Sequence, residues 1–414
     1  MLSLGKYSIG ISNYFTHQGV AHLDALQLAT ENGFEITPVW SKSFLVHNHT
    51  KSTATDFFLQ TKNAVEESKW TKPYFIDSEN INHDNISFFV DSCNYFTFSV
   101  SDYQASKASE DKIVAFTKLI DTSFGSISIT GIEHTISFTS NDIYSFCSKY
   151  LGAVEAIGLM YNTLVQKKKN SDFICEISLA ECENPLSIIE TYFLFSAFSL
   201  ENIPVQVFSP RFSGRFLRSV DFDGKLSVFE NELKTNILLL QEVQLKFAYP
   251  HNLKIGIHNS CDKPSIYPVI NKVIKQYNVG IHLKTSSWAW LNECITLINA
   301  NEDTLDLIKS IYAIAVSQQS KLIKPYKNSL TINETQLPTS AEMFIWNTEG
   351  MNAILDIDNE YFNINVRQLL SISYQIAVEY GDVFLEALKD NNISLAKQQQ
   401  NQLYSEIIKS VFIK

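Results

Sequence analysis

The chain has 414 residues, of which 45% are hydrophobic and 12% are aromatic, including 28 Phe and 18 Tyr. This composition supplies a large buried core and excludes a disordered chain. With 33 Lys and Arg against 44 Asp and Glu, the formal net charge is −11. The chain therefore lacks the broad basic face that a nucleic-acid backbone requires, which excludes nucleic acid as the expected partner.

Short apolar stretches rich in β-branched and aromatic residues recur along the chain, separated by segments long enough for a helix. The predicted strands cover residues 6–12, 34–40, 72–77, 95–101, 172–179, 203–209, 253–259 and 280–286. Two of the helix-like segments between them end at Gly33 and Gly280, as helices commonly do. Because no hairpin signal joins successive strands, the pattern predicts right-handed parallel crossovers.

Eight such strands predict an α/β fold, with a TIM-barrel-like closed parallel barrel over residues 1–300. An open doubly wound sheet is the alternative, and the lack of a glycine-rich dinucleotide motif after an early strand disfavours its nucleotide-binding version. The β-rich stretch 123–139 either replaces one of the eight strands or forms an extra hairpin within a rim insertion at 102–170. Residues 301–414 are mostly helical in pattern and are predicted to form an extension packed on the barrel.

Two successive predicted strands, "LKIGIHNSCDK" and "VGIHLKTSS", end in a histidine followed by a lysine. Alternate strand residues point into a parallel barrel, and the C-terminal rim carries the chemistry. The apolar isoleucines suit the helical ring, so the opposite faces, with His258, His282 and Lys284, are expected to look inward. Gly256 leaves room below them. The two strands are therefore predicted to feed one reaction mouth.

Other charged residues fall at the ends of predicted strands or in the loops after them. Glu176, inside an apolar strand, requires a partner, and either a lysine or a metal satisfies it. The remaining rim candidates are His17, Gln18, Lys42, Glu181, Arg211, Arg215, Asp221, Asp262 and Lys263. Imidazoles with a carboxylate suit a divalent transition metal that polarises a carbonyl, and cationic side chains suit an anionic polyol. The residues thus predict a metal-assisted isomerase, epimerase or aldolase acting on a small acidic sugar.

Six stretches, in order over nearly the whole chain, together resemble the tagaturonate epimerase family. They are "YSIGISNYFTHQG", "ITPVWSKS", "SGRFLRSVDF", "IHNSCDKPSIYPVIN", "GIHLKTSSWAWLNE" and "VRQLLSISY". The resemblance implies a barrel-type fold, a divalent metal (Mn, Ni or Zn) and interconversion of tagaturonate and fructuronate by inversion at carbon 4. The route that it implies is retro-aldol cleavage between carbons 3 and 4, rotation, and re-addition to the other face.

The resemblance also implies roles for the matching residues. His258 and His282 are expected to bind the metal, and Asp262 to take part in catalysis. Glu176, which belongs to none of the matching stretches, is added as a catalytic candidate from its place at a strand end. The expected substrate-binding residues are His17, Gln18, Lys42, Arg215, Asp221, Lys263, Lys284 and Arg367.

The chain departs from the family pattern at two positions. Residues 131–135 read "GIEHT" where the family reads "GIDEP", and Ser371 stands where the family's "RQLLH" has histidine. We expect Glu133 and His134 to supply a catalytic base or ligand, with His134 as a further metal ligand that replaces the missing imidazole. The alternative is a paralogue that has lost catalysis and binds a sugar acid or a partner protein. A homo-oligomer is left open.

The six cysteines form no CxxC pair and are spread too evenly for a zinc knuckle. This predicts reduced thiols and a cytoplasmic protein. The N-terminal stretch lacks the pattern of a signal peptide, and no run approaches eighteen apolar residues, so no membrane partner is expected.

Overall fold

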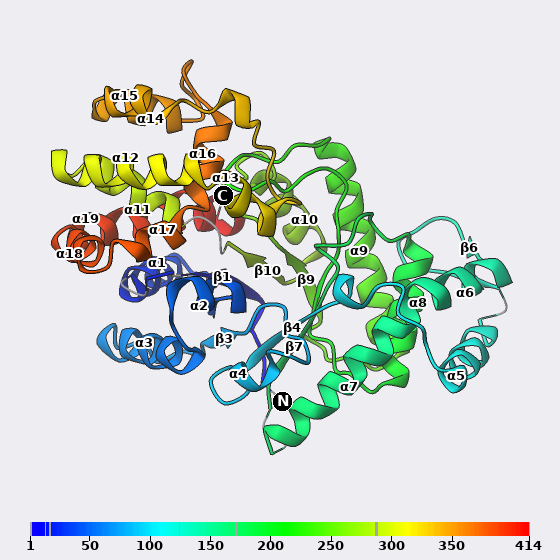
Figure 1. Cartoon of the computed structure of the whole chain (residues 1–414). Helices are drawn as coiled ribbons and strands as arrows, with labels where there is room; N and C mark the ends of the chain where they lie inside the picture. Colours follow the sequence, from blue (N-terminus) through cyan, green and yellow to red (C-terminus); the bar gives the residue numbers. More distant parts are fainter. Residues whose placement is uncertain are drawn as a thin grey trace.

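The structure is a computed structural model that describes residues 2–12, 14–15, 18–123, 125–169, 172–285 and 289–413. Eight parallel strands, one in each predicted region, close a barrel in the order β1-β10-β9-β8-β7-β4-β3-β2 (Figure 1). They are β1 (Tyr7–Ile11), β2 (Ile36–Ser41), β3 (Phe75–Asp77), β4 (Tyr95–Ser99), β7 (Ile174–Ser178), β8 (Val207–Ser209), β9 (Lys254–Ile257) and β10 (Ile281–Lys284). The closed barrel is confirmed over the open sheet.

The stretch 123–139 forms an extra hairpin and replaces none of the barrel strands. Strands β5 (Ser126–Ile127) and β6 (Ile136–Ser137) pair antiparallel in a separate two-stranded sheet. The insertion also contains η1 (Ser101–Tyr103), α5 (Glu110–Asp121), α6 (Ser140–Phe146), η2 (Cys147–Leu151) and α7 (Gly152–Lys167). Figure 1 shows β6 at the outer side of this insertion, away from the barrel strands.

Helices follow the strands and cover the barrel. Beside α7, they are α1 (Gly19–Glu31), α2 (Phe44–Thr50), α3 (Ala54–Glu67), α4 (Ile86–Phe89), α8 (Ile188–Leu200), α9 (Leu226–Lys246) and α10 (Tyr267–Tyr277). Local sequence fixes several of their ends. A reciprocal capping box between Ser187 and Glu190 starts α8, and Asn278 in the left-handed conformation, with φ 51°, ends α10.

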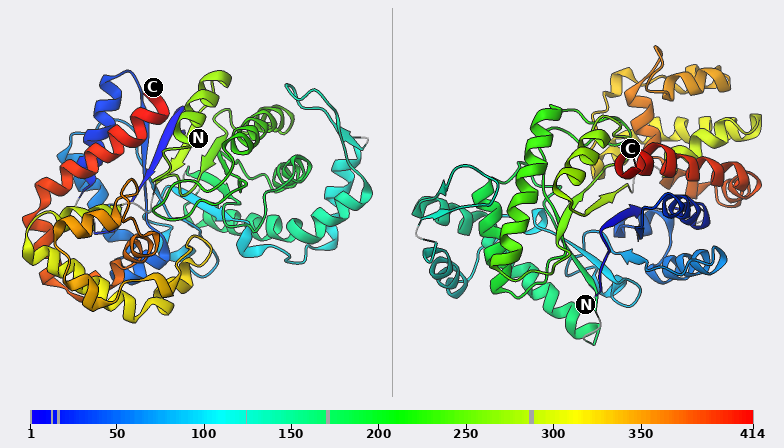
Figure 2. Two further views of the ribbon diagram at one scale, coloured as in Figure 1. Left: turned by 90° about the horizontal axis from the view of Figure 1, so that it is seen from above. Right: turned by 180° about the vertical axis from the view of Figure 1, so that it is seen from behind.

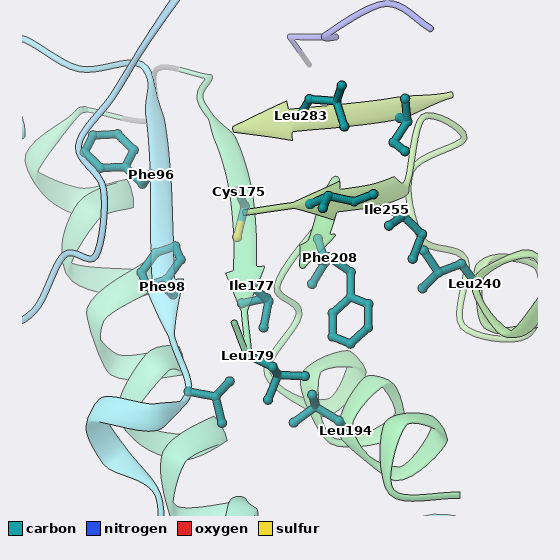
Figure 3. Packing of buried hydrophobic residues seen from close by; sticks show 14 of the residues in the cluster. Phe96, Phe98, Cys175, Ile177, Leu179, Leu194, Phe208, Leu240, Ile255 and Leu283 are labelled. Carbon is teal, nitrogen blue, oxygen red and sulfur yellow. The ribbon is translucent and has the colours of Figure 1, made fainter. Parts of the chain in front are cut away.

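Outward-facing strand residues form the main core between the barrel and its helices. Figure 3 shows Phe96, Ile177 and Ile255 on the barrel strands β4, β7 and β9, in one buried cluster with Leu194 and Leu240 of the surrounding helices. The expected outward direction of the isoleucines is therefore confirmed for β9, and Leu283 of β10 joins the same core. Burial of these large side chains drives the strands into the alternation on which the inward face depends.

The barrel interior is apolar at the bottom and polar above. The apolar layer consists of Leu4, Val39, Phe75, Tyr95, Ile174 and Val207. Two inward glycines make room in the polar layer. A Cβ on Gly256 would lie 2.0 Å from Ser209 Oγ, and one on Gly10 would lie 3.2 Å from Lys284 Cγ. The space that the missing side chain of Gly256 leaves is therefore filled by Ser209, as the sequence-based prediction of room at this glycine requires.

Residues after β10 form helices that lie to one side of the barrel in Figure 2, and these helices build a second hydrophobic core. Its helices are α11 (Ala289–Ile298), α12 (Glu302–Ser317), α13 (Gln319–Ile323), η3 (Lys324–Tyr326), η4 (Glu334–Gln336), α14 (Ser340–Phe344), α15 (Thr348–Leu355), α16 (Ile364–Ser371), α17 (Tyr374–Glu379), α18 (Asp382–Asp390) and α19 (Asn392–Asn401). Because Trp290 belongs to this core, the boundary predicted at residue 300 falls after the first helix of the extension.

The last helix, η5 (Gln402–Ile413), returns to the barrel, where the ring of Phe412 lies 5.1 Å from that of Tyr7. All six cysteines are buried and free, as expected. In the part of the chain that the structure describes, every helix is too short or too polar to cross a membrane.

Candidate active site

A buried ion-pair cluster occupies the C-terminal mouth of the barrel. Lys284, the last residue of β10, reaches across the interior to the opposite strands. Its Nζ lies 2.7 Å from Asp77 Oδ2 and 2.8 Å from Glu176 Oε2, and it donates to Thr97 Oγ1 at 2.7 Å. The side chains of Lys284, Asp77 and Glu176 are at most 3% exposed. One ammonium thus holds two buried carboxylates together, which is the requirement for keeping all three charges out of water.

Glu176 is the hub of this cluster. Its Oε1 accepts from Ser209 Oγ and from His258 Nε2, each at 2.6 Å. Its Oε2 accepts from Tyr95 Oη at 2.5 Å, and Thr97 Oγ1 lies 3.1 Å away. The parallel register contributes to this convergence, because Glu176 aligns with Thr97 on β4 and with Val207 on β8, two residues before Ser209. The carboxylate is therefore fixed in position by side chains of β4, β8 and β10 and by His258, which follows β9.

The cluster sets the protonation of its members. Burial favours the neutral acid of Glu176, but Lys284 and His258 outweigh it and hold the pKa of Glu176 well below its usual range. Burial favours the neutral amine of Lys284, but Asp77 and Glu176 raise the pKa of that lysine above its ordinary value. Burial raises the pKa of Asp77 to about 6, against the lowering effect of Lys284. The raised pKa favours the protonated form of Lys284 near neutral pH, so a positive charge rather than a free amine is the expected role of this side chain.

His282 lies below this cluster, inside the barrel. Its Nδ1 is 2.9 Å from Ser8 Oγ, and its ring lies 5.6 Å from the ring of Tyr95. Burial lowers the pKa of His282 to about 3, so the ring is neutral. His282 thus faces inward as predicted, although it pairs with a serine rather than with His258.

Above the cluster is an open cavity of about 300 Å³. His258 and Lys284 form its floor side, and residues of the C-terminal extension form part of its wall. The full lining is Ser43, Glu79, Asn80, Glu181, Arg218, His258, Asn259, Lys284, Pro325, Tyr326, Asn328 and Ser329. A second cavity of about 380 Å³ shares Glu181, Asn259, Asn328 and Ser329 with the first and includes Arg211 and Arg215. The mouth therefore continues into a polar cleft beneath the extension.

Two predicted cations bind backbone carbonyl groups instead of facing the cavity. Lys263 is fully buried, and its Nζ donates to the carbonyl oxygens of Leu217, Val220 and Cys261 at 2.9, 2.5 and 2.9 Å. Arg367 donates to the carbonyl oxygens of Ser219 and Leu355, each at 2.6 Å. Neither residue lines the two cavities of the mouth, so a direct contact of Lys263 or Arg367 with substrate stays a prediction.

The acidic rim residues Asp221 and Asp262 also contact other parts of the rim. Asp262 Oδ1 lies 3.7 Å from an Arg367 nitrogen, and Asp221 Oδ1 accepts from Ser265 Oγ at 2.8 Å. Neither carboxylate lines the two cavities of the mouth. The structure therefore gives Asp221 and Asp262 loop-fixing contacts and does not place Asp262 among the reacting groups.

Lys42, Gln18 and Arg215, which are also predicted to bind substrate, do not line the cavity beside Lys284. Lys42 is buried and donates to the carbonyl oxygen of Tyr14 at 2.9 Å, and burial lowers its pKa to about 8. Gln18 donates to Asn392 Oδ1 at 3.2 Å. Arg215 lines the second cavity but forms an ion pair with Asp223 on the surface. His17 lies outside the described residues.

Glu133 and His134 are both exposed in the turn between β5 and β6. The hairpin stands on the rim insertion, so the structure does not bring either residue to the barrel mouth (Figure 1). Ser371 is buried and donates to the carbonyl oxygen of Gln368 at 2.7 Å. The expectation that His134 replaces the missing imidazole therefore finds no support in this arrangement.

The predicted metal ligands do not assemble into a coordination shell. His258 Nε2 is used by Glu176, His282 Nδ1 lies against Ser8, and His134 is on the hairpin. Among the described residues, no three His, Cys, Asp or Glu side chains are grouped so that they could hold a metal ion. The cation between the two carboxylates is the ammonium of Lys284. These side chains do not fit a divalent metal with three protein ligands.

Sequence reasoning missed four groups that complete the cluster, namely Asp77, Tyr95, Thr97 and Ser209. Asp77 and Ser209 are the last residues of β3 and β8. Extending the inward-face argument from the last two strands to every strand end would have found both. Tyr95 and Thr97 lie on one face of β4, and only the register with β7 shows that this face meets Glu176.

Comparisons with known proteins agree with this architecture. The family model for tagaturonate epimerase (UxaE) matches residues 2–414. The tagaturonate/fructuronate epimerase of Thermotoga maritima is 24% identical over 279 residues, which span 67% of this chain and about half, 51%, of that protein.

The fold also agrees with solved structures. The crystal structure of native fructuronate-tagaturonate epimerase UxaE from Cohnella laeviribosi superposes with a TM-score of 0.80 at 18% identity, over 99% of this chain and 82% of that chain. Its complex with two glycerols gives a TM-score of 0.81, also at 18% identity, over 100% and 83% of the two chains. At this identity the structures show a shared barrel fold, whereas the family model covers nearly every residue. The chain belongs to the tagaturonate epimerase family.

Proposed function

We propose that this protein inverts carbon 4 of a six-carbon keto acid and interconverts tagaturonate and fructuronate. The observation that carries the proposal is the cluster of Lys284, Glu176 and His258, which opens onto a cavity of about 300 Å³ in a member of this family. That volume lies at the lower end of the range of small-molecule sites and suits a single sugar acid.

The reaction begins with removal of the proton from the carbon-4 hydroxyl. His258 is the candidate base, because it lines the cavity and Glu176 orients its ring through Nε2. The bond between carbons 3 and 4 then breaks, and its electron pair moves through carbons 3 and 2 to the carbonyl oxygen. This gives the enediolate of a three-carbon fragment and a three-carbon aldehyde that carries the carboxylate.

Lys284 is positioned to stabilise the enediolate oxygen. Its ammonium lines the cavity and is charged at neutral pH, so it supplies a fixed positive charge where negative charge develops. Rotation of the aldehyde by half a turn presents its other face to the enediolate. Re-addition reforms the bond between carbons 3 and 4, and the proton returns from His258 to the new carbon-4 oxygen. No step is assigned to a metal, because the described side chains do not supply its ligands.

The test is to incubate the purified protein with D-tagaturonate in D₂O and to follow the products by NMR. We expect fructuronate to form with its carbon-4 hydrogen unexchanged, because retro-aldol cleavage leaves that C–H bond intact. Glu176→Gln should reduce turnover by at least about 100-fold, since it removes the charge that orients both Lys284 and His258. Failure of the folded wild-type protein to convert either uronate would refute the proposal and favour the binding-protein alternative. Deuterium at carbon 4 would refute the retro-aldol route.

A further inference from the structure

We propose that Arg218 binds the carboxylate of the substrate and so selects acids over neutral ketoses. Sequence analysis singled out Arg211, Arg215 and Arg367, but not this arginine. The identity of the acid rests on the proposed function, whereas the assignment of the carboxylate subsite rests on the contacts of Arg218 itself. Three observations carry it: its place in the cavity, the groups that hold its guanidinium, and the lack of a carboxylate within 4.0 Å of it among the described residues, although Glu79 and Glu181 also line the cavity.

Arg218 lines the same cavity as His258 and Lys284. The loop that carries it is fastened to the C-terminal extension, because its backbone N–H donates to the Ser329 carbonyl at 2.8 Å and Gln368 Nε2 donates to its carbonyl at 3.1 Å. A sugar acid in this cavity therefore meets a guanidinium and the reacting cluster at once. Its carboxylate would lie on Arg218 while the carbons that react lie over Lys284 and His258.

Tyrosines fix the guanidinium group. Its central carbon lies 4.7 Å from the ring centroid of Tyr326, and Nη1 donates to Tyr14 Oη at 3.4 Å. These tyrosines are held in turn by Tyr374, whose hydroxyl lies 2.6 Å from that of Tyr326 and whose ring stacks on Tyr14 at 4.7 Å. A guanidinium fixed before the ligand arrives loses little rotamer freedom on binding, so its hydrogen bonds contribute more fully to affinity.

Within the described residues, no carboxylate lies within 4.0 Å of Arg218, and its buried Nε has no acceptor. Arg215 and Arg367 of the rim differ in this respect. Arg215 forms an ion pair with Asp223, and Arg367 binds two carbonyl groups and lies beside Asp262. A partly buried guanidinium without an anion is costly, and a ligand carboxylate can satisfy it with two parallel hydrogen bonds. A ligand carboxylate in this cavity would therefore provide Arg218 with the ion-pair partner that it lacks among the described residues.

The test compares binding of D-fructuronate and D-fructose by titration calorimetry. We expect the wild-type protein to bind the uronate more tightly than the neutral ketose. Arg218→Met should weaken uronate binding by about 10- to 100-fold, the loss typical of a charge-assisted hydrogen bond, while fructose binding stays within about twofold. Arg218→Lys should recover part of the lost affinity, because lysine keeps the positive charge but cannot form the two parallel hydrogen bonds of a guanidinium group. A neutral ketose bound as tightly as the uronate by the wild-type protein would overturn the proposal.

Arg211→Met is the matched control. Arg211 lines the neighbouring cavity and its Nε is also without an acceptor in the described part of the chain. We expect its removal to leave the preference for the uronate intact. Loss of the preference in Arg211→Met, or its persistence in Arg218→Met, would overturn the assignment. If Arg218→Met does not fold, Tyr326→Leu, which removes the ring beneath the guanidinium, should weaken uronate binding selectively, and unchanged binding there would count against the assignment.

The two proposals fail in different ways. Selective uronate binding through Arg218 without turnover would refute the epimerase and leave the carboxylate subsite in place. Turnover with unchanged uronate binding and KM in Arg218→Met would refute the subsite alone. In an active enzyme, we expect Arg218→Met to raise KM for the uronate more than it lowers kcat, because the carboxylate does not change during the reaction.

Discussion

The barrel mouth and the rim around it both bury charged side chains, yet they use them differently. In the mouth, Lys284 faces two carboxylates and borders an open cavity. In the rim, Lys263 is the lysine that comes after β9 and His258. Its ammonium group donates to three backbone carbonyl groups. Both ammonium groups have three partners, so what separates them is position: Lys284 lines the cavity and can act on a ligand there, whereas Lys263 ties loops together away from it.

A charged residue at the rim of a barrel is not by itself a functional residue. Its partners decide its role. Glu293 in α11 is a third case, because it is buried in the extension and its Oε2 has no partner among the described residues. Charged side chains in the mouth form ion pairs with one another, and Lys263 in the rim is hydrogen-bonded to the backbone. In the core of the extension, burial favours the neutral form of Glu293.

Exchanging the two lysines for methionine should give the largest contrast. Lys284→Met should abolish turnover, by at least about 1000-fold, because it removes the cation at the developing enediolate. It should also lower the free energy of unfolding by about 3–5 kcal/mol, since Asp77 and Glu176 remain buried without their partner. Lys263→Met should cost about 1–3 kcal/mol but leave turnover per folded molecule within about threefold. Urea unfolding and product NMR measure both quantities. Abolished turnover in folded Lys263→Met would contradict the structural role that we assign to Lys263.

Glu293→Gln should change the pH dependence of stability. Burial raises the pKa of Glu293 to about 8, from an ordinary value of 4.5. The folded state therefore holds this proton more tightly, so its contribution is complete below about pH 4.5 and is lost as the pH rises through about 8. Relative to the wild type, Glu293→Gln should gain on the order of 3 kcal/mol between pH 5 and pH 9. Urea unfolding at several pH values measures the difference, and a constant difference would show that folding does not raise the pKa of Glu293.

A tyrosine pair provides a smaller test of the same contrast. Tyr95 donates to Glu176 in the mouth, and Tyr267 donates to the Ser260 carbonyl at 2.8 Å in the rim. Each change to phenylalanine should cost about 1 kcal/mol of stability, the usual value of a hydrogen bond. Tyr95→Phe should lower kcat by about tenfold, because one fixed donor to Glu176 is lost, and Tyr267→Phe should leave kcat unchanged. Equal effects on kcat would contradict the division between mouth and rim.

Chelation should have the smallest effect. Because Lys284 provides the cation and the described side chains form no metal site, we expect dialysis against EDTA to change turnover by less than about twofold. Metal content per chain, measured by plasma mass spectrometry before and after dialysis, is the control. Turnover that disappears on dialysis and returns only with an added divalent ion would show that other residues complete a coordination shell.

Local pattern predicted much of the fold and part of the site. All eight barrel strands follow from short β-branched runs, and the inward faces of β9 and β10 follow from alternation. Glu176, His258 and Lys284 were found because strand ends of a parallel barrel converge. The same logic does not extend to the loops. Lys263 and Arg367 bind carbonyl groups of segments far away in the sequence, Leu217–Val220 and Ser219, and no periodicity reports such contacts.

The sequence by itself determined the alternation of strands and helices, because burial of apolar faces is a local and periodic requirement. It also determined the family, through motifs spread over the whole chain. Only the tertiary structure decided which charges meet. The register of β4 and β7 brings Thr97 to Glu176, barrel closure brings Lys284 to Asp77, and the extension brings Tyr326 to Arg218. Electrostatic partners act over a few ångströms in space, and that distance is set by closure and packing rather than by spacing along the chain.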